Sequence, residues 1–175
     1  MTGAPTLDCA GAMVANPWVI IRDAAVQGAE LGVDSQDVIV PLPLWQSERD
    51  QLRARKGRVG VWLDADADPL ELADSIALLP LIAVNFPAPT DGRGLSVAVL
   101  LRTRLNFSGE LRAIGDVRQD QLSYMRRCGF TTFTPAAGAD LGAISDGLVV
   151  MSDYYQASVD EPLPLFRRRT PAASG

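Results

Sequence analysis

The chain has 175 residues, of which 47% are hydrophobic, so it is long enough and apolar enough to bury a core as one domain. The net charge of −5 and the pI of about 4.7 argue against general affinity for DNA or RNA. The chain contains no histidine, which excludes Ser-His-Asp and Cys-His catalysis as well as zinc and haem sites with histidine ligands.

The cysteines and the apolar runs point to an ordinary intracellular protein. Cys9 and Cys128 are too few for a Cys-rich metal site or an iron–sulfur cluster within one chain, and a disulfide between them stays open. No apolar run reaches the roughly 18 residues of a membrane span, and the first residues lack the features of a signal peptide. We therefore expect a cytoplasmic protein with reduced thiols and no membrane or nucleic-acid partner.

The first third of the chain predicts an irregular, β-rich region. We expect the first stretch to be loosely ordered and two strands to follow, at residues 18–23 and 37–45. Two prolines make the second of these an edge strand or an extended arm. A short polar helix is expected over residues 47–57, with Ser47 as its N-cap and Gly57 as its end.

From residue 58 onward, strands and helices alternate. The expected strands, each with the helix that follows it, are residues 58–63 and 70–79, 81–86 and 94–105, 110–115 and 117–128, and 130–134 and 141 to about 158. Capping residues are expected at Asp68, at Asp116 with Gln119 as its capping-box partner, and at Asp140. The alternation predicts an α/β fold of repeated βα units with a mainly parallel sheet, either open and doubly wound or an incomplete βα barrel.

The predicted organisation has three parts. Residues 1–57 form a short N-terminal arm packed on the main domain, residues 58–160 the βα-repeat domain, and residues 161–175 a C-terminal arm and tail. Ligands of such sheets bind at the carboxyl ends of the strands. The loops expected to line a site there are residues 64–68, 85–96, 115–121 and 134–140.

The acidic loop DADAD, residues 64–68, allows two interpretations. A magnesium ion would use one or two of its carboxylates, whereas an EF-hand is excluded because Pro69 and Ser75 stand where its glycine and glutamate are required. The simpler interpretation makes Asp68 a helix cap and the others a solvated turn, so we predict no metal site. A phospho-receiver site is disfavoured because Lys56, the only lysine, precedes the first strand of this series.

The turn TDGRGLS before the second of these helices offers an anion site. Gly92 and Gly94 allow close backbone approach, the helix start presents unpaired N–H groups, and Arg93 can clamp an oxyanion. The alternative is a purely structural turn, in which Ser96 or Asp91 caps the helix and Arg93 is solvated. The turn lacks both the P-loop lysine and the dinucleotide GxGxxG pattern.

Other residues are singled out by their positions within elements. Arg112 lies inside a predicted strand, where an arginine needs a partner or a ligand. Cys128 falls on the apolar face of its helix and is interpreted as a core thiol rather than a nucleophile. Arg126 and Arg127 lie near the C-terminus of the same helix, where the helix dipole favours positive charge.

The segment TDGRGLSVAVLLRTRLNFSGELRAIGDVRQDQLSYMRRCGF, residues 90–130, resembles the signature of a bacterial family known as domain of unknown function 934. The pattern of that family runs DGRG-S, LR, GELRA-GDV-DQ and MRRCGF. Its members are often encoded beside assimilatory sulfite reductase and other sulfate-reduction enzymes, and some carry an oxidoreductase label. The resemblance implies a place in sulfur assimilation. Because the pattern includes Arg93, it also favours ligand contact at this turn, and sulfite and sulfate are small oxyanions.

Three functions compete at this stage, and the sequence leaves it uncertain whether the protein is an enzyme. The first, implied by the family context, is an accessory protein of assimilatory sulfite reduction that acts with sulfite reductase or its electron donor. The second is an enzyme acting on a phosphorylated or sulfur-containing small molecule, with Asp91 or Asp116 as general base and Arg93 as anion clamp. The other residues expected to contact its ligand are Gly92, Gly94, Ser96, Arg112 and Gln121.

The third function is a flavin- or nicotinamide-using oxidoreductase, and the sequence supports it least, because no GxGxxG follows any predicted strand. The cofactor, if there is one, is left unknown. A homo-oligomer stays open, because the Pro-rich apolar segments 41–45 and 161–166 need a surface to pack on.

Overall fold

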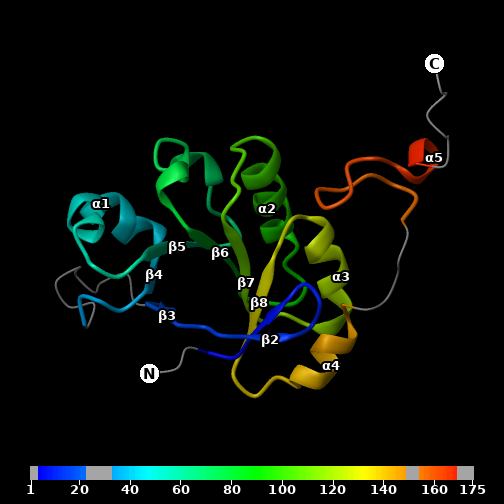
Figure 1. Cartoon of the computed structure of the whole chain (residues 1–175), viewed down its shortest axis with the longest axis horizontal. Helices are drawn as coiled ribbons and strands as arrows, with labels where there is room; N and C mark the ends of the chain where they lie inside the picture. The colour runs from blue at the N-terminus through cyan, green and yellow to red at the C-terminus, as the bar shows by residue number, and fades with distance from the viewer. Residues whose placement is uncertain (1–3, 23–32, 149–153, 169–175) are drawn as a thin grey trace.

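The computed structural model describes residues 4–22, 33–148 and 154–168. Within them, eight strands form one curled, mostly parallel sheet, a half-barrel with helices along its outer face (Figure 1). The strands are β1 Thr6–Asp8, β2 Met13–Val14, β3 Val19–Ile20, β4 Val38–Pro41, β5 Val59–Leu63, β6 Leu81–Phe86, β7 Glu110–Gly115 and β8 Thr132–Pro135. The helices are α1 Leu42–Arg53, α2 Arg93–Thr103, α3 Gln119–Arg127, α4 Leu141–Asp146 and α5 Leu165–Arg168, with the 3₁₀ turns η2 Pro69–Leu72 and η3 Ile76–Leu78.

The strand order is β2-β1-β8-β7-β6-β5-β4-β3. From β3 to β8 each strand is parallel to the next one along the chain, whereas β1 runs antiparallel to both β2 and β8. When each right-handed crossover leads to the next strand in the same direction across the sheet, all connecting helices lie on one face, as in part of a βα barrel. In a doubly wound sheet the strand order reverses, and helices cover both faces. The prediction of an α/β fold with a mainly parallel sheet is confirmed.

The main core lies between the sheet and the helices. On this side the sheet contributes Val61 of β5, Val84 of β6 and Leu111 of β7. Leu101 of α2 and Leu122 of α3 belong to the same buried cluster. All five side chains are fully buried. The nearly continuous apolar sequences of β5 and β6 are typical of a parallel sheet that is covered on both faces.

The opposite, inner face of the sheet has a small core of its own. Trp18 belongs there to one buried cluster with Ile39 of β4, Leu81 and Ala83 of β6 and Ile114 of β7, and the partly buried Trp62 of β5 packs against it. These side chains are the alternate residues of the same strands. The inner face is therefore covered by the beginning of the chain rather than by helices.

The covering segment connects the two edges of the half-barrel. Strands β2 and β3 follow each other in the sequence but lie at opposite ends of the strand order, so residues 15–18 cross the inner face between them (Figure 1). We call residues 13–20 the strap. Five residue steps reach at most about 18 Å, which bounds the distance from Val14 to Val19 and shows how far the sheet has curled. The expectation of a loosely ordered start is wrong for the residues of β1 and β2.

The expectation that the prolines near residue 40 make residues 37–45 an edge strand or an extended arm is wrong. Strand β4 lies inside the sheet between β3 and β5, and the chain turns into α1 at Leu42. Pro41 is the N-cap and Pro43 stands in the first turn, where no backbone N–H is needed. Ser47 is consequently an internal residue of α1, whose hydroxyl donates to the Leu44 carbonyl, and not its N-cap.

The helix expected at residues 70–79 is replaced by the two 3₁₀ turns η2 and η3. Asp68 does cap the first turn, accepting from the Leu70 N–H at 2.9 Å. The buried Ser75 lies between the two turns, where its hydroxyl donates to the Leu72 carbonyl and accepts from Trp45 Nε1. A hydroxyl that binds nearby backbone competes with the helical hydrogen-bond pattern.

The remaining helices differ from expectation at their ends. Helix α3 begins two residues later than expected, with Arg118 as N-cap and Gln121 Oε1 accepting from its N–H, so the capping box at Asp116 is wrong. Gly129, with φ of +103°, ends α3 as expected. Asp140 caps α4 as expected, but α4 ends at Asp146. Part of the longer helix expected there, residues 149–153, lies outside the described residues, as do Asp23 and the tail from residue 169.

Candidate functional site

In the turn before α2, the carboxylate of Asp91 occupies the position next to Arg93 that was predicted for an anionic ligand. Asp91 accepts hydrogen bonds from three donors of Arg93: the backbone N–H at 3.2 Å, Nε at 2.9 Å and Nη2 at 2.7 Å. These bonds lower the pKa of Asp91 and raise that of Arg93. We call the end of the sheet where the parallel strands have their carboxyl ends, together with the loops that follow them, the carboxyl edge. Arg93 Nη1 also lies 3.9 Å from a carboxylate oxygen of Asp66, so the arginine connects two loops of this edge.

The other residues of this turn have mainly structural contacts. A Cβ on Gly94 would lie within 3.0 Å of the Phe86 ring and Val84, so this glycine allows α2 to approach β6. Gly92 is the N-cap of α2, without a side-chain cap, and a Cβ there would make only an ordinary contact of 3.9 Å with Leu95 Cδ1. Ser96 is exposed in the first turn of the helix.

The loop after β7 repeats the arrangement of the first turn. The carboxylate of Asp116 pairs with the guanidinium of Arg118, two residues on, with Nε to Oδ1 at 3.2 Å. Gln121 Nε2 donates to the Pro89 carbonyl at 2.5 Å and so joins α3 to the loop that carries Asp91. The two predicted general bases therefore stand on loops that a hydrogen bond links, each carboxylate paired with an exposed arginine.

A hollow of about 300 Å³ opens beside these loops, at the carboxyl ends of β4 and β5. Trp62, Asp64, Asp66 and Glu71 are among the residues that line it. Asp64 accepts from Asn85 Nδ2 at 2.9 Å, and Glu71 accepts from Gln46 Nε2 at 2.6 Å. Among the described residues, no group of three or more acidic or cysteine side chains is arranged to hold a metal ion.

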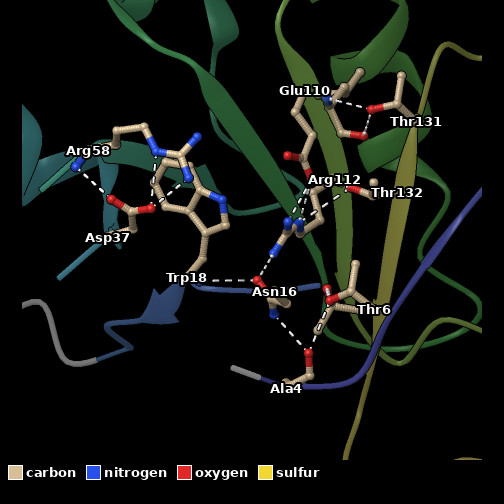
Figure 2. Close-up of polar contacts among 12 residues, drawn as sticks. Ala4, Thr6, Asn16, Trp18, Asp37, Arg58, Glu110, Arg112, Thr131 and Thr132 are labelled. Carbon is tan, nitrogen blue, oxygen red and sulfur yellow. Dashed lines mark hydrogen bonds and ion pairs between the residues drawn. The ribbon is translucent and has the colours of Figure 1, made fainter. Parts of the chain in front are cut away.

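Arg112 lies apart from this edge, on the inner face of the sheet (Figure 2). It is 2% exposed and donates from Nε and Nη2 to Glu110 Oε1 at 2.9 and 2.6 Å. Nη1 donates to Asn16 Oδ1 of the strap at 2.9 Å, and Nε also reaches Thr132 Oγ1 at 3.3 Å. The arginine therefore has protein partners on every side, and the structure does not bring it together with Asp91, Arg93, Asp116 and Gln121.

Further hydrogen bonds hold the strap over Arg112, and no sequence pattern predicts them. Asn16 Nδ2 donates to the Ala4 carbonyl at 2.7 Å, and its Oδ1 also accepts from the Trp18 N–H (Figure 2). The Trp18 ring lies under the Arg58 guanidinium, 4.8 Å from its centroid. Only the spacing of Glu110 and Arg112, two residues apart on one face of a strand, was visible in the sequence.

The cysteines are free thiols in contact with the protein interior. Cys128 is buried, which confirms its interpretation as a core thiol, and Cys9 Sγ lies 3.2 Å from the carbonyls of Phe130 and Thr131. Burial raises the pKa of both thiols. A raised thiol pKa means less of the nucleophilic thiolate at neutral pH.

Fold and edge together define a mixed α/β half-barrel protein whose carboxyl edge carries paired charges. The family model of bacterial proteins of unknown function, DUF934, matches residues 60–166, which include strands β6, β7 and β8 and the turn before α2. The chain belongs to this family. A comparison with curated proteins and with solved structures gives no match. In the described residues, no helix combines the length and apolar character that crossing a membrane requires.

Proposed function

We propose that this protein is a cytoplasmic accessory protein of assimilatory sulfite reduction, in the synthesis of cysteine, and that it acts by binding sulfite reductase or its electron donor. The family supports the metabolic context through the resemblance described above. The observation that carries the binding role is the pairing at the carboxyl edge, where Asp91 and Asp116 each hold an arginine two residues away. Fixed, exposed charge pairs of this kind suit recognition of a complementary protein surface.

The protonation chemistry of Asp91 supports the same proposal. A general base works best when its pKa lies near the working pH. The hydrogen bonds from Arg93 lower the pKa of Asp91 further below that range. Asp91 therefore stays ionised as the partner of Arg93 and is a weak base at neutral pH.

A second candidate is a small-molecule enzyme or oxidoreductase with an oxyanion site at the same edge. The observation that favours it is the position of Arg93, whose side chain is 61% exposed and reaches Asp66 at the rim of the 300 Å³ hollow. A sulfite or phosphate group would take the place of the Asp91 carboxylate on the arginine. Asp91→Asn removes that competing charge, so calorimetric titration with sulfite is expected to show tighter binding to this variant than to the wild type.

A deletion strain tests the proposed context. We expect it to fail on sulfate and on sulfite as sole sulfur source and to grow on sulfide and on cysteine. Complementation with Arg93→Ala and Asp116→Asn tests the edge, with Arg104→Gln as a control for an exposed arginine outside it. Normal growth of the deletion strain on sulfite would contradict the proposal.

The two candidates differ in stoichiometry. Purified protein added to an extract of the deletion strain should restore sulfite reduction. An accessory subunit is expected to restore it in proportion to its amount, up to about one copy per reductase. An enzyme that supplies a small molecule would restore it at a small fraction of that amount. Rescue by trace protein would therefore overturn the accessory role in favour of catalysis.

A further inference from the structure

A separate groove lies between α2, α3 and the C-terminal segment 154–162. Its volume is about 440 Å³, which falls in the size range of small-molecule sites, about 300–1,000 Å³. Val99 and Thr103 of α2 form one wall, and Tyr124 of α3 stands at the rim. The C-terminal segment, residues 156–159, forms the facing wall.

Several bonds fix the C-terminal segment against α3, so the groove is preformed. The Val159 N–H donates to the Arg127 carbonyl at 2.9 Å. The carboxylate of Asp160 lies 3.5 Å from Arg126 Nε, and the hydroxyls of Ser123 and Tyr154 share a hydrogen bond. A preformed wall spares a ligand the cost of ordering it.

Arg127 supplies the positive charge of the groove and has donor capacity left over. Its guanidinium carbon lies 4.2 Å from the centroid of the Tyr154 ring, and Nη2 makes one long bond, 3.4 Å, to the Gln156 carbonyl. Its Nε is buried and has no acceptor among the described residues. The same arginine borders a second hollow, of about 260 Å³, beside Tyr155. Because Nε has almost no accessible surface, the donors that a ligand oxygen can reach are the terminal guanidinium nitrogens, of which Nη2 makes only the one long bond.

The rest of the groove is apolar or aromatic. Cys128, at the base, is 5% exposed, and burial raises its pKa, so it presents a neutral thiol. The Tyr124 ring is 55% exposed and offers a face for stacking. One charged donor within such walls selects a ligand that combines a flat apolar body with a single negative group.

We propose that this groove binds an amphipathic organic anion, a small molecule with an aromatic or apolar body and one carboxylate or phosphate group. The body packs on Val99 and Tyr124, and the anionic group bonds to Arg127. The site is independent of the carboxyl edge and of the role in sulfite reduction.

The test is a titration of the ¹⁵N-labelled full chain followed by NMR, with phenyl phosphate and benzoate as probes. We expect saturable shifts at the amides of Thr103, Tyr124 and Gln156. Arg127→Gln should weaken phenyl phosphate binding about tenfold, the effect of losing one charge-assisted bond. Arg104→Gln, which removes the same charge from an exposed arginine that does not line the groove, should change the Kd by less than about twofold. Inorganic phosphate and phenol should each bind at least about tenfold more weakly than phenyl phosphate.

Several results would overturn this site. Shifts that never saturate, or an Arg127→Gln variant that binds as tightly as the wild type, would remove it. Shifts confined to the amides of residues 92–96 would place the anion at the turn before α2 instead. Unchanged amide positions elsewhere show that each variant is folded, and Tyr124→Ser, at an exposed ring, gives a second variant that should weaken both aromatic probes.

Discussion

The inner face and the carboxyl edge use the same local device in opposite surroundings. Each contains a carboxylate and an arginine two residues apart that form an ion pair within 3.5 Å: Glu110–Arg112 on the inner face, and Asp91–Arg93 and Asp116–Arg118 at the edge. The arginine side chain is 3% exposed on the inner face, against 61% and 59% at the edge. The spacing of two residues allows the ion pair to form, and the burial of the pair decides how much it contributes to the free energy of unfolding.

The difference follows from solvent. At the edge, water and salt screen the charges, and such pairs add little stability. On the inner face, the strap removes water, so a charge left without its partner is costly. The inner pair is thus suited to holding the fold, and the edge pairs are suited to meeting something outside it.

The largest effect is expected for Arg112→Leu. It leaves Glu110 partly buried without its cation and should lower the free energy of unfolding by about 3 kcal/mol or more. Urea unfolding followed by circular dichroism measures this. In the double variant Glu110→Leu with Arg112→Leu no charge remains, so part of the loss should be recovered. Equal instability of the single and double variants would show that the pair itself has no such weight.

Asn16→Ala tests the strap alone. It removes the acceptor of Arg112 Nη1 and the donor to the Ala4 carbonyl, and should cost about 1–3 kcal/mol in the same urea assay. Asn16→Asp keeps the acceptor and loses the donor, so its loss should be the smaller. If both variants unfold at the wild-type midpoint, the strap does not stabilise the inner face.

The edge pair of Asp91 should show its effect through pH. Because the pKa of Asp91 is lowered in the folded protein, its ionised form is favoured by folding. The resulting stability is present above the unfolded pKa, about 3.9, and is lost as pH falls through the lower folded pKa. The small difference between wild type and Asp91→Asn at pH 7 should therefore shrink as the pH is lowered below about 3.9. A difference that persists undiminished in acid would show that another interaction causes it.

Arg118→Gln is expected to have the smallest effect. Its exposed pair with Asp116 should leave the urea midpoint unchanged within error at physiological salt. Since Arg112→Leu removes the same charge from an equivalent sequence spacing, the two variants measured side by side isolate the contribution of burial. A loss for Arg118→Gln as large as that for Asn16→Ala would end the contrast between the two regions.

Local sequence was sufficient for the central part of the fold. Strands β5 and β6 are nearly continuous apolar runs, and Asp68, Asp140 and Gly129 stop or start elements through bonds to near neighbours. The same is true of the edge, where Asp91 and Arg93 are two residues apart. The DGRG turn was correctly placed at the start of a helix, although its ligand contacts stay a prediction.

The position of the strap across the inner face could not be predicted from local sequence. Strands β2 and β3 have two residues each, too few to show a period, and the bond between Asn16 and Arg112 spans 96 positions. The turn from β4 into α1 was missed because prolines break strands and also open helices, and only the neighbouring strands decide between the two. Where partners are distant in sequence, residue type predicts that Arg112 needs a partner but does not identify it.

The long span between β1 and its partner also has a consequence for synthesis on the ribosome. Leu7 pairs with Phe133, so β1 has no strand to join until β8 has been translated. At about 5–20 residues per second, the ribosome needs about 6 s or more to make the intervening chain. Strand β1 is therefore synthesised early but reaches its place late, and this end of the sheet stays incomplete until β8 has been translated.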